Sequence, residues 1–156
     1  MGCGPRAMAD FLQGEAARLK RARPVLAESR EQQALVEMAW AHANHPRYGI
    51  IAECLFAIPN GADVAEHHRA RLVKEGLASG YPDLGLDVAR GGYHGLRIEM
   101  KAPGGYTNKA HSERQAKRHA LLMREGYFAA LCDDWQFAWK ILCEYVDGKI
   151  RRGSSA

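Results

Sequence analysis

The sequence predicts an α/β fold, because segments with helical periodicity alternate along it with shorter apolar segments typical of strands. Two segments, Asp83–Val88 and His94–Met100, alternate strictly between apolar and polar side chains, which is typical of half-buried strands. Amphipathic helices are predicted before and after this pair. With 156 residues, of which 47% are hydrophobic, the chain is expected to fold around one core.

The predicted elements follow the order helix, strand, helix, strand, strand, helix, strand, helix. Besides the two alternating strands, their bounds are Glu28–Ala43 (helix), Ile50–Ile58 (strand), Val64–Lys74 (helix), Ser112–Glu125 (helix), Tyr127–Cys132 (strand) and Asp134–Val146 (helix). Ser112 and Gln115 have the spacing of a capping box, which predicts that their helix begins there. Trp40, Trp135 and Trp139 stand among aliphatic residues at helical spacing and are expected in the core.

The two ends of the chain differ in composition from its centre. Residues 1–26 are rich in arginine and lysine and form a predicted basic N-terminal arm, residues 27–150 form the single domain, and residues 151–156 are a predicted loose tail. The net charge of +4 is compatible with a polyanionic partner. The four cysteines form no C-x-x-C pair, and the chain shows neither a signal peptide nor a membrane span, so a cytoplasmic location is expected.

A hairpin between the two alternating strands brings chemically useful side chains together. If the turn is centred on Gly91 and Gly92, Asp83 lies opposite Glu99. Lys101 then projects from the same side as Glu99, because side chains alternate along a strand. The sequence therefore predicts two carboxylates and one ammonium group on one face of the hairpin.

This combination suits the hydrolysis of phosphodiesters. Two facing carboxylates repel each other, and a bound Mg²⁺ or Mn²⁺ relieves that repulsion. A neighbouring lysine can orient a water molecule or neutralise charge that develops on the phosphate. The alternative for Asp83, Glu99 and Lys101 is an exposed hairpin face with an ordinary salt bridge.

The motifs around these residues resemble a known nuclease family. Tyr81-Pro82-Asp83-Leu84 followed by Ile98-Glu99-Met100-Lys101 resembles the PD-(D/E)xK signature. Further stretches resemble, in order, the virus-type replication-repair nucleases, the VRR-NUC family, over roughly Glu28 to Val146. These stretches are Ile58-Pro59-Asn60-Gly61, Lys74 to Gly80, Tyr93-His94-Gly95-Leu96, Ser112-Glu113-Arg114-Gln115 and Gly126-Tyr127.

The resemblance implies a restriction-endonuclease-like core, a mixed sheet of about four strands flanked by helices, and a Mg²⁺-dependent DNA endonuclease. Asp83, Glu99 and the Met100 carbonyl would bind the metal, for which Mn²⁺ is expected to substitute. Glu31 of the first helix is expected to complete the site, with Glu28 as the alternative one turn away. Gln115 would help to hold the attacking water or the phosphate, unless it serves only as a helix cap.

DNA contact is expected from a cluster of basic residues near the predicted site, with a solvated helix face as the alternative reading. The cluster comprises Lys109, Arg114, Lys117 and Arg118. In contrast, His67 and His68 point about 100° apart on a helix and predict no zinc site. The chain also departs from the family at Gly61-Ala62-Asp63-Val64, where relatives usually carry a second glycine and a nearby arginine.

For the substrate, the resemblance implies branched DNA in repair or recombination. Stand-alone members of the family resemble Holliday-junction resolvases, which predicts a homodimer whose two-fold symmetry matches that of a four-way junction. A monomeric nicking or flap nuclease and a restriction-like enzyme with sequence preference are alternatives. A DNA-binding module that keeps the fold without turnover is the alternative from another class.

Overall fold

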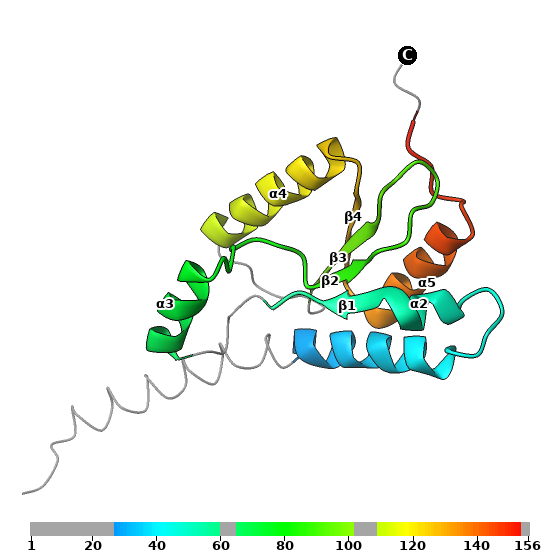
Figure 1. Ribbon diagram of the computed structural model, residues 1–156, viewed down its shortest axis with the longest axis horizontal. Helices are drawn as coiled ribbons and strands as arrows, with labels where there is room; N and C mark the ends of the chain where they lie inside the picture. The colour runs from blue at the N-terminus through cyan, green and yellow to red at the C-terminus, as the bar shows by residue number, and fades with distance from the viewer. Residues whose placement is uncertain (1–26, 60–64, 102–108, 154–156) are drawn as a thin grey trace, which may run out of the picture.

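The computed structural model describes residues 27–59, 65–101 and 109–153. The predicted basic arm, and the predicted departure from the family at residues 61–64, lie outside these ranges. Residues 27–41 form a helix, here called the 27–41 helix. The elements that follow it are α2 (Gly49–Cys54), β1 (Leu55–Ala57), α3 (Glu66–Lys74), β2 (Leu84–Leu86), β3 (Leu96–Met100), α4 (Lys109–Arg124), β4 (Phe128–Cys132) and α5 (Trp135–Val146), as Figure 1 shows.

The four described strands form one mixed sheet in the order β1-β2-β3-β4. The first two pairings are antiparallel, whereas β3 and β4 are parallel and are connected through α4. The predicted hairpin register is confirmed, since Leu84 pairs with Ile98 and Leu86 with Leu96. Gly91 and Gly92 in its turn have φ values of 58° and 84°, which glycine adopts without a steric cost.

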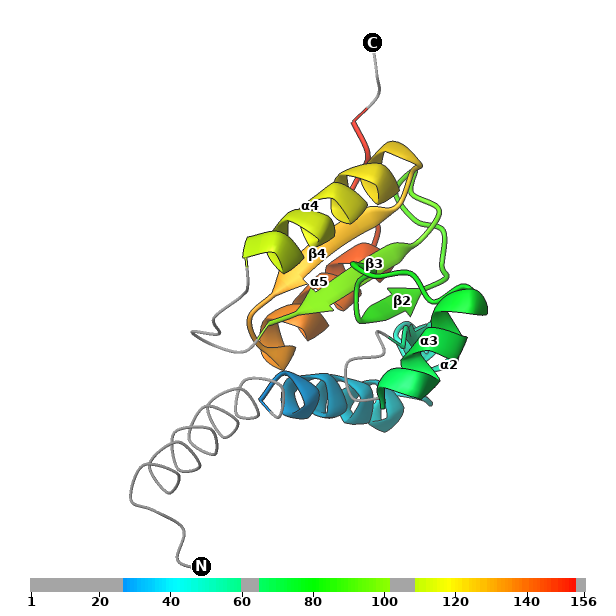
Figure 2. The ribbon, with the colours of Figure 1, turned by 90° about the vertical axis from the view of Figure 1, so that its left-hand side faces the viewer.

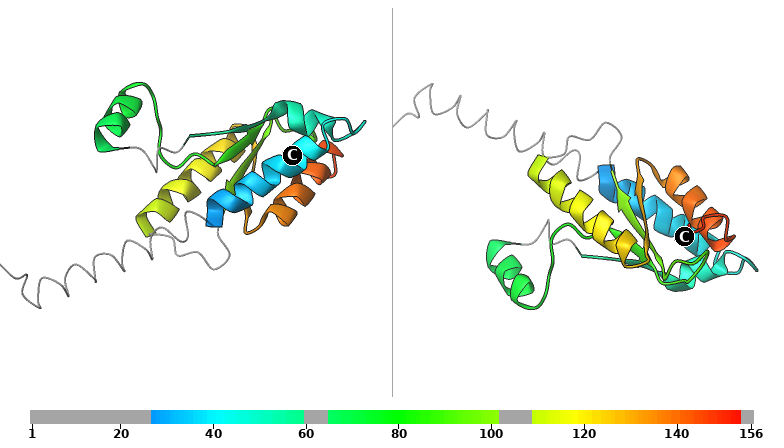
Figure 3. Two further views of the ribbon diagram at one scale, coloured as in Figure 1. Left: turned by 90° about the horizontal axis from the view of Figure 1, so that it is seen from below. Right: turned by 90° about the horizontal axis from the view of Figure 1, so that it is seen from above.

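Helices cover both faces of this sheet. Figures 2 and 3 show α4 on one face and α5 with the 27–41 helix on the other, while α3 stands out from this body. The face towards α5 carries the even-numbered side chains of β2 and β3, among them Leu84 and Ile98, which are fully buried. Leu35 of the 27–41 helix and Leu142 of α5 pack against them in the core. The odd-numbered side chains face α4.

Two predictions about the strands were wrong. All residues of β2 and β3 are buried, so these strands are not half-buried. Of the polar residues of β3, Glu99 is covered by Gln115 of α4, and Arg97 is covered by Phe56 and Tyr127. The segment predicted as one strand from Ile50 to Ile58 begins as the helix α2 and becomes extended only at Leu55. A short apolar run is compatible with either structure, and here tertiary packing decided in favour of a helical turn that buries Ile51.

Trp40 was also predicted wrongly, because 66% of its surface is exposed. Its predecessor Ala39 is buried against the core, and the next residue on a helix projects about 100° away. Trp135 and Trp139 are partly buried against the core, as predicted.

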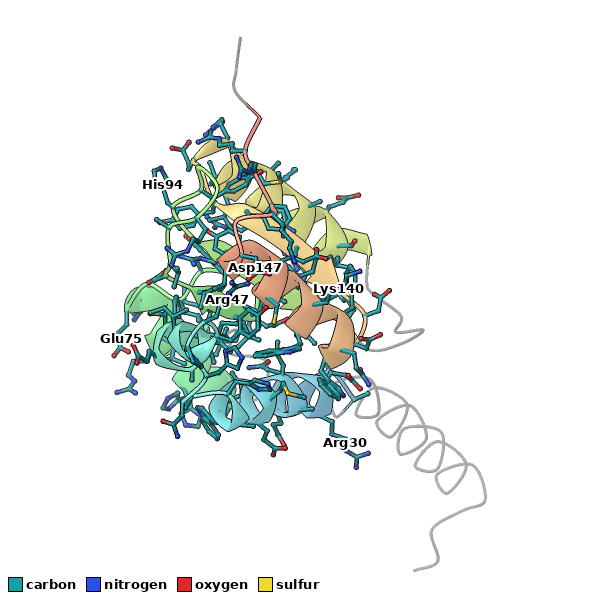
Figure 4. All side chains as sticks on the ribbon, turned by 90° about the vertical axis from the view of Figure 1, so that its right-hand side faces the viewer. Arg30, Arg47, Glu75, His94, Lys140 and Asp147 are labelled. Atoms are coloured by element: carbon teal, nitrogen blue, oxygen red, sulfur yellow. The ribbon has the colours of Figure 1, made fainter. Side chains whose placement is uncertain are left out.

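The segment that follows α5 is attached to the rest of the fold. Arg47, after the 27–41 helix, donates to Asp147 at the end of α5 over 3.3 Å (Figure 4), and Lys149 lies 2.9 Å from the same carboxylate. The main-chain amide of Arg152 donates to the Gly91 carbonyl over 2.8 Å, so the first residues of the predicted loose tail contact the hairpin turn. No helix in the described part of the chain is long and apolar enough to span a membrane.

Candidate active site

Asp83 lies just before β2, at the edge of the sheet where β3 ends. Its carbonyl accepts a hydrogen bond from the Ile58 amide over 2.8 Å, which fixes its main chain beside the segment that follows β1. Its carboxylate Oδ2 accepts from the Met100 amide, also over 2.8 Å. The main chain of both neighbouring strands therefore positions this carboxylate at the end of β3.

Glu99 is the most deeply buried ionisable residue of the site, with only 2% of its surface exposed. Its Oε1 accepts from Lys101 Nζ over 2.6 Å and from the Gln115 amide nitrogen. Its Oε2 is buried and has no hydrogen-bond partner among the described residues. Burial, and then the negative charge of Asp83, raise the pKa of Glu99 to about 7, although the hydrogen bond from Lys101 opposes the rise.

Gln115 connects α4 to the end of β3. Lys101 Nζ donates to Gln115 Oε1 over 3.2 Å, so Glu99, Lys101 and Gln115 form a closed hydrogen-bonded group. The predicted capping box was wrong, because α4 already includes Lys109 and Ser112 lies inside the helix. Gln115 thus has its side chain turned towards the sheet, where it is buried, and is available for the role that the family resemblance implies.

The two glutamates of the 27–41 helix occupy different environments. Glu31 Oε2 accepts from the main-chain amide of Trp135 over 2.9 Å and so satisfies a donor at the start of α5. Glu28 lines the same pocket as Asp83 and Glu99, and its charge adds, after burial and Asp83, to the raised pKa of Glu99. The structure therefore brings Glu28, the alternative, to the pocket, and places the carboxylate of Glu31 at the start of α5.

These side chains line an open pocket of about 390 Å³. It is lined by Glu28, Arg69, Ser79, Gly80, Tyr81, Asp83, Glu99, Lys101, Arg114 and Gln115. Sequence analysis missed the contribution of Arg69, since nothing in the sequence indicates that α3 approaches the strand ends. His119 follows Gln115 by one helical turn and shares its face, but it does not line the pocket. Burial, and then the charge of Lys101, lower the pKa of His119.

The predicted DNA-contacting residues all lie on α4, and the structure describes the side chains of three of them. Arg114 lines the pocket, and the Arg118 guanidinium lies 4.3 Å from the centre of the Tyr81 ring. Lys117 is exposed to solvent. The side chain of Lys109, at the first residue of α4, lies outside the described part of the structure.

The donor set is compatible with a divalent cation of the Mg²⁺ type. No cluster of three or more His, Cys, Asp or Glu side chains suited to a metal occurs among the described residues. Mg²⁺ usually takes one or two carboxylates and keeps several waters and substrate phosphates, so Asp83 and Glu99 are a sufficient set. The unpartnered, buried Oε2 of Glu99 beside a second carboxylate is the observation that favours a cation there.

A mixed sheet flanked by helices, with Asp83, Glu99 and Lys101 at one edge, defines the PD-(D/E)xK type of nuclease fold. A solved structure described as a VRR_NUC domain protein is similar to this chain, with a TM-score of 0.60 and 27% sequence identity. The similarity covers 83% of this chain and 96% of that one. No family model and no curated protein matched. The chain has the VRR-NUC fold, as its motifs predicted, and the similarity supports a nuclease-type function.

Proposed function

We propose that the protein is a metal-dependent DNA endonuclease that hydrolyses phosphodiester bonds at the pocket around Glu99. The environment of Glu99 carries the proposal: a carboxylate buried to 98% faces Asp83, is hydrogen-bonded to Lys101 and Gln115, and keeps one oxygen without a partner among the described residues. A purely structural carboxylate at this depth would normally have both oxygens satisfied. A site that binds a cation and a phosphate gives a reason for this arrangement.

Asp83, Glu99 and the Met100 carbonyl would hold the cation, with Glu28 rather than Glu31 as an additional carboxylate on the pocket wall. When bound, Mg²⁺ would supply Lewis-acid activation of the phosphodiester and lower the pKa of a bound water. Because Met100 donates its amide to Asp83, the same residue that offers a carbonyl also orients one of the carboxylates. Mn²⁺ is expected to substitute for Mg²⁺ because it has the same preference for oxygen ligands.

Lys101 contributes a positive charge at the point where the phosphate would lie. Its side chain is 15% exposed, so the ammonium group is largely removed from solvent and its field is weakly screened. The hydrogen bonds to Glu99 and Gln115 fix its position before substrate arrives. Preorganised charge of this kind stabilises negative charge that develops on the phosphate without further rearrangement. Gln115 hydrogen-bonds to both Lys101 and Glu99 and so fixes their relative position.

Binding of DNA would use the basic residues that border the pocket. Arg69 comes from α3 and Arg114 from α4, so they reach the pocket from two different elements. Lys117 and Arg118 extend this positive surface along α4. Each phosphate that such residues neutralise releases counterions, so the apparent affinity should fall steeply as the salt concentration rises.

A plasmid-nicking assay with Mg²⁺, compared with the same reaction in EDTA, tests the proposal. Lys101→Ala should reduce cleavage by at least about a hundredfold, because it removes charge stabilisation in the transition state. Glu28→Gln and Glu31→Gln form a matched pair on one helix. The Glu28 variant should lower activity, whereas the Glu31 variant keeps an acceptor for Trp135 and should cut at the wild-type rate. Full activity in EDTA would refute the mechanism.

The proposed substrate is branched DNA, cut by a homodimer. The argument is one of symmetry: two copies related by a two-fold axis present two sites that match the two-fold symmetry of a four-way junction. Sedimentation equilibrium at micromolar concentration and cleavage of a labelled junction test both halves. A monomeric mass with equal rates on junction and linear duplex would favour a nicking or flap nuclease instead. Metal-independent binding without any turnover would favour a DNA-binding module.

A further inference from the structure

A second pocket of about 440 Å³ opens on the same side of the sheet as the candidate active site. Its walls are mostly apolar: Phe56 of β1, Ile58 after it, Leu77 and Tyr81 of the segment before β2. Arg97 is the charged side chain among the residues that line it. Neither the nuclease motif nor the proposed reaction uses this pocket.

The floor of the pocket is a row of residues that crosses three strands. Phe56 pairs with Gly85, and Gly85 pairs with Arg97. A side chain at Gly85 would collide with the ring of Phe56, so glycine at this central position lets the ring lie over β2. The Arg97 guanidinium carbon lies 5.5 Å from the centre of the Phe56 ring, which is 38% exposed. One aromatic ring therefore remains accessible to solvent, with an arginine held close to it.

Arg97 is fixed from several sides. Its guanidinium lies 4.4 Å from the centre of the Tyr127 ring, Nη1 donates to the Leu96 carbonyl over 3.0 Å, and the same nitrogen lies 3.1 Å from the Asp87 carboxylate. Asp87 thus offsets its charge. Only 9% of Arg97 is exposed and its guanidinium lies between the Phe56 and Tyr127 rings, so it supports the Phe56 ring rather than offering a free charge to a phosphate.

The second pocket adjoins the candidate active site. Tyr81 lines both pockets. Arg97 and Glu99 are two residues apart on β3 and project from the same face, so their rows are separated by about 7 Å along the strand. A nucleotide whose phosphate lies beside Glu99 would therefore have its base within reach of Phe56 and Arg97.

We propose that this pocket receives an unstacked nucleobase of the DNA substrate, adjacent to the phosphate that is cut. The proposal rests on the proposed nuclease function. The chemistry of the pocket identifies the ligand: an apolar cavity with an exposed phenyl ring can stack on the face of any base, whatever the DNA sequence. A fully stacked duplex does not offer such a base. The enzyme therefore favours DNA with an unpaired nucleotide at the cut, as at a flap or gap.

The test combines a change in the protein with a change in the DNA. Phe56→Ala is compared with wild type in the full-length chain, with Phe137→Ala as a control, since Phe137 is a similarly exposed phenylalanine on α5. Each protein is given gapped duplexes in which one nucleotide next to the mapped cut is either normal or abasic. We expect Phe56→Ala to lower kcat/KM about tenfold on normal DNA. The abasic nucleotide should cost wild type and the control about as much, and Phe56→Ala almost nothing.

Binding provides a readout that does not depend on cleavage. 2-Aminopurine at the same position, measured in EDTA, should change its fluorescence on binding to wild type, and this change should be lost in Phe56→Ala. If Phe56→Ala fails to fold by circular dichroism, Phe56→Leu keeps the packing over Gly85 without the aromatic face. Equal abasic penalties in wild type and Phe56→Ala, together with the same 2-aminopurine fluorescence change in both proteins, would overturn the proposal. Loss of cleavage by every protein with an intact fluorescence change would reject only the nuclease function.

Discussion

Glu99→Gln should make the metal-free protein more stable at alkaline pH, even though it removes a residue of the proposed active site. Glutamine is close in shape to a protonated glutamate and can keep the hydrogen bond to Gln115 or Lys101. It carries no charge that burial and Asp83 would oppose. The substitution therefore isolates the energetic cost of holding an ionised carboxylate at this position when no cation is bound.

The magnitude follows from the pKa of Glu99, which burial and then Asp83 raise from 4.5 to about 7. Between these two pH values the folded protein keeps a proton that the unfolded chain releases, so the free energy of unfolding falls as pH rises. The difference between 7 and 4.5, at about 1.4 kcal/mol per pH unit, corresponds to ~3 kcal/mol. This contribution of protonated Glu99 to the free energy of unfolding is fully present below about pH 4.5 and is lost as the pH rises through about 7.

Urea unfolding in EDTA measures the effect at several pH values between 4.5 and 8.5. The difference between Glu99→Gln and wild type should be smallest at the acidic end and rise to ~2–3 kcal/mol in favour of the variant at the alkaline end. Other ionisable groups are common to both proteins and cancel in the difference. Glu113→Gln, on the exposed side of α4, is the control and should differ from wild type by less than about 0.5 kcal/mol throughout. A difference that does not change with pH would refute the reasoning.

Three further predictions concern the cation and the fold. Mg²⁺ should raise the Tm of wild type but not of Glu99→Gln in differential scanning fluorimetry, because a ligand that binds the folded state stabilises it and the variant lacks a proposed metal ligand. Equal Tm shifts in the two proteins would mean that the cation binds elsewhere. Tyr145→Phe should cost about 1–3 kcal/mol in urea unfolding, since the buried hydroxyl donates to the Val88 carbonyl over 2.8 Å; a cost near zero would mean that water replaces it. Gly91→Ala should lower the free energy of unfolding more than Gly148→Ala does in the same assay. Both glycines have positive φ, but only at Gly91 would a methyl group collide with the Ile150 carbonyl. Equal losses of stability in the two variants would contradict this prediction.

Local patterns in the sequence were sufficient for the hairpin and for the pair of motifs that it carries. Strict alternation defines which side chains share a face, and Gly91 with Gly92 defines where the chain turns, so the register of Leu84 with Ile98 followed. The proximity of Glu99 to Asp83 and Lys101 is a consequence of that register. The similarity to a VRR_NUC domain protein was likewise predicted from motifs, because these occur in a fixed order along the chain.

Packing between distant elements decided what these patterns left open. Periodicity places Glu28 and Glu31 on a similar helix face. In the structure, Glu31 accepts a hydrogen bond from the Trp135 amide at the start of α5, whereas Glu28 lines the pocket. Gln115 has the spacing of a helix cap, but α4 begins earlier, at Lys109, and the Gln115 side chain donates a hydrogen bond to Glu99 of β3.

The sequence by itself determined the α/β class, the hairpin and the identity of the central carboxylates and lysine, because strand alternation and turn chemistry act over a few residues. Only the tertiary structure decided that Gln115 of α4 packs over Glu99, and the burial of Glu99 is the main cause of its raised pKa. It also decided that Phe56 and Arg97 meet across Gly85. These contacts join residues 41 positions apart in the chain, as between Phe56 and Arg97, and no local pattern encodes them.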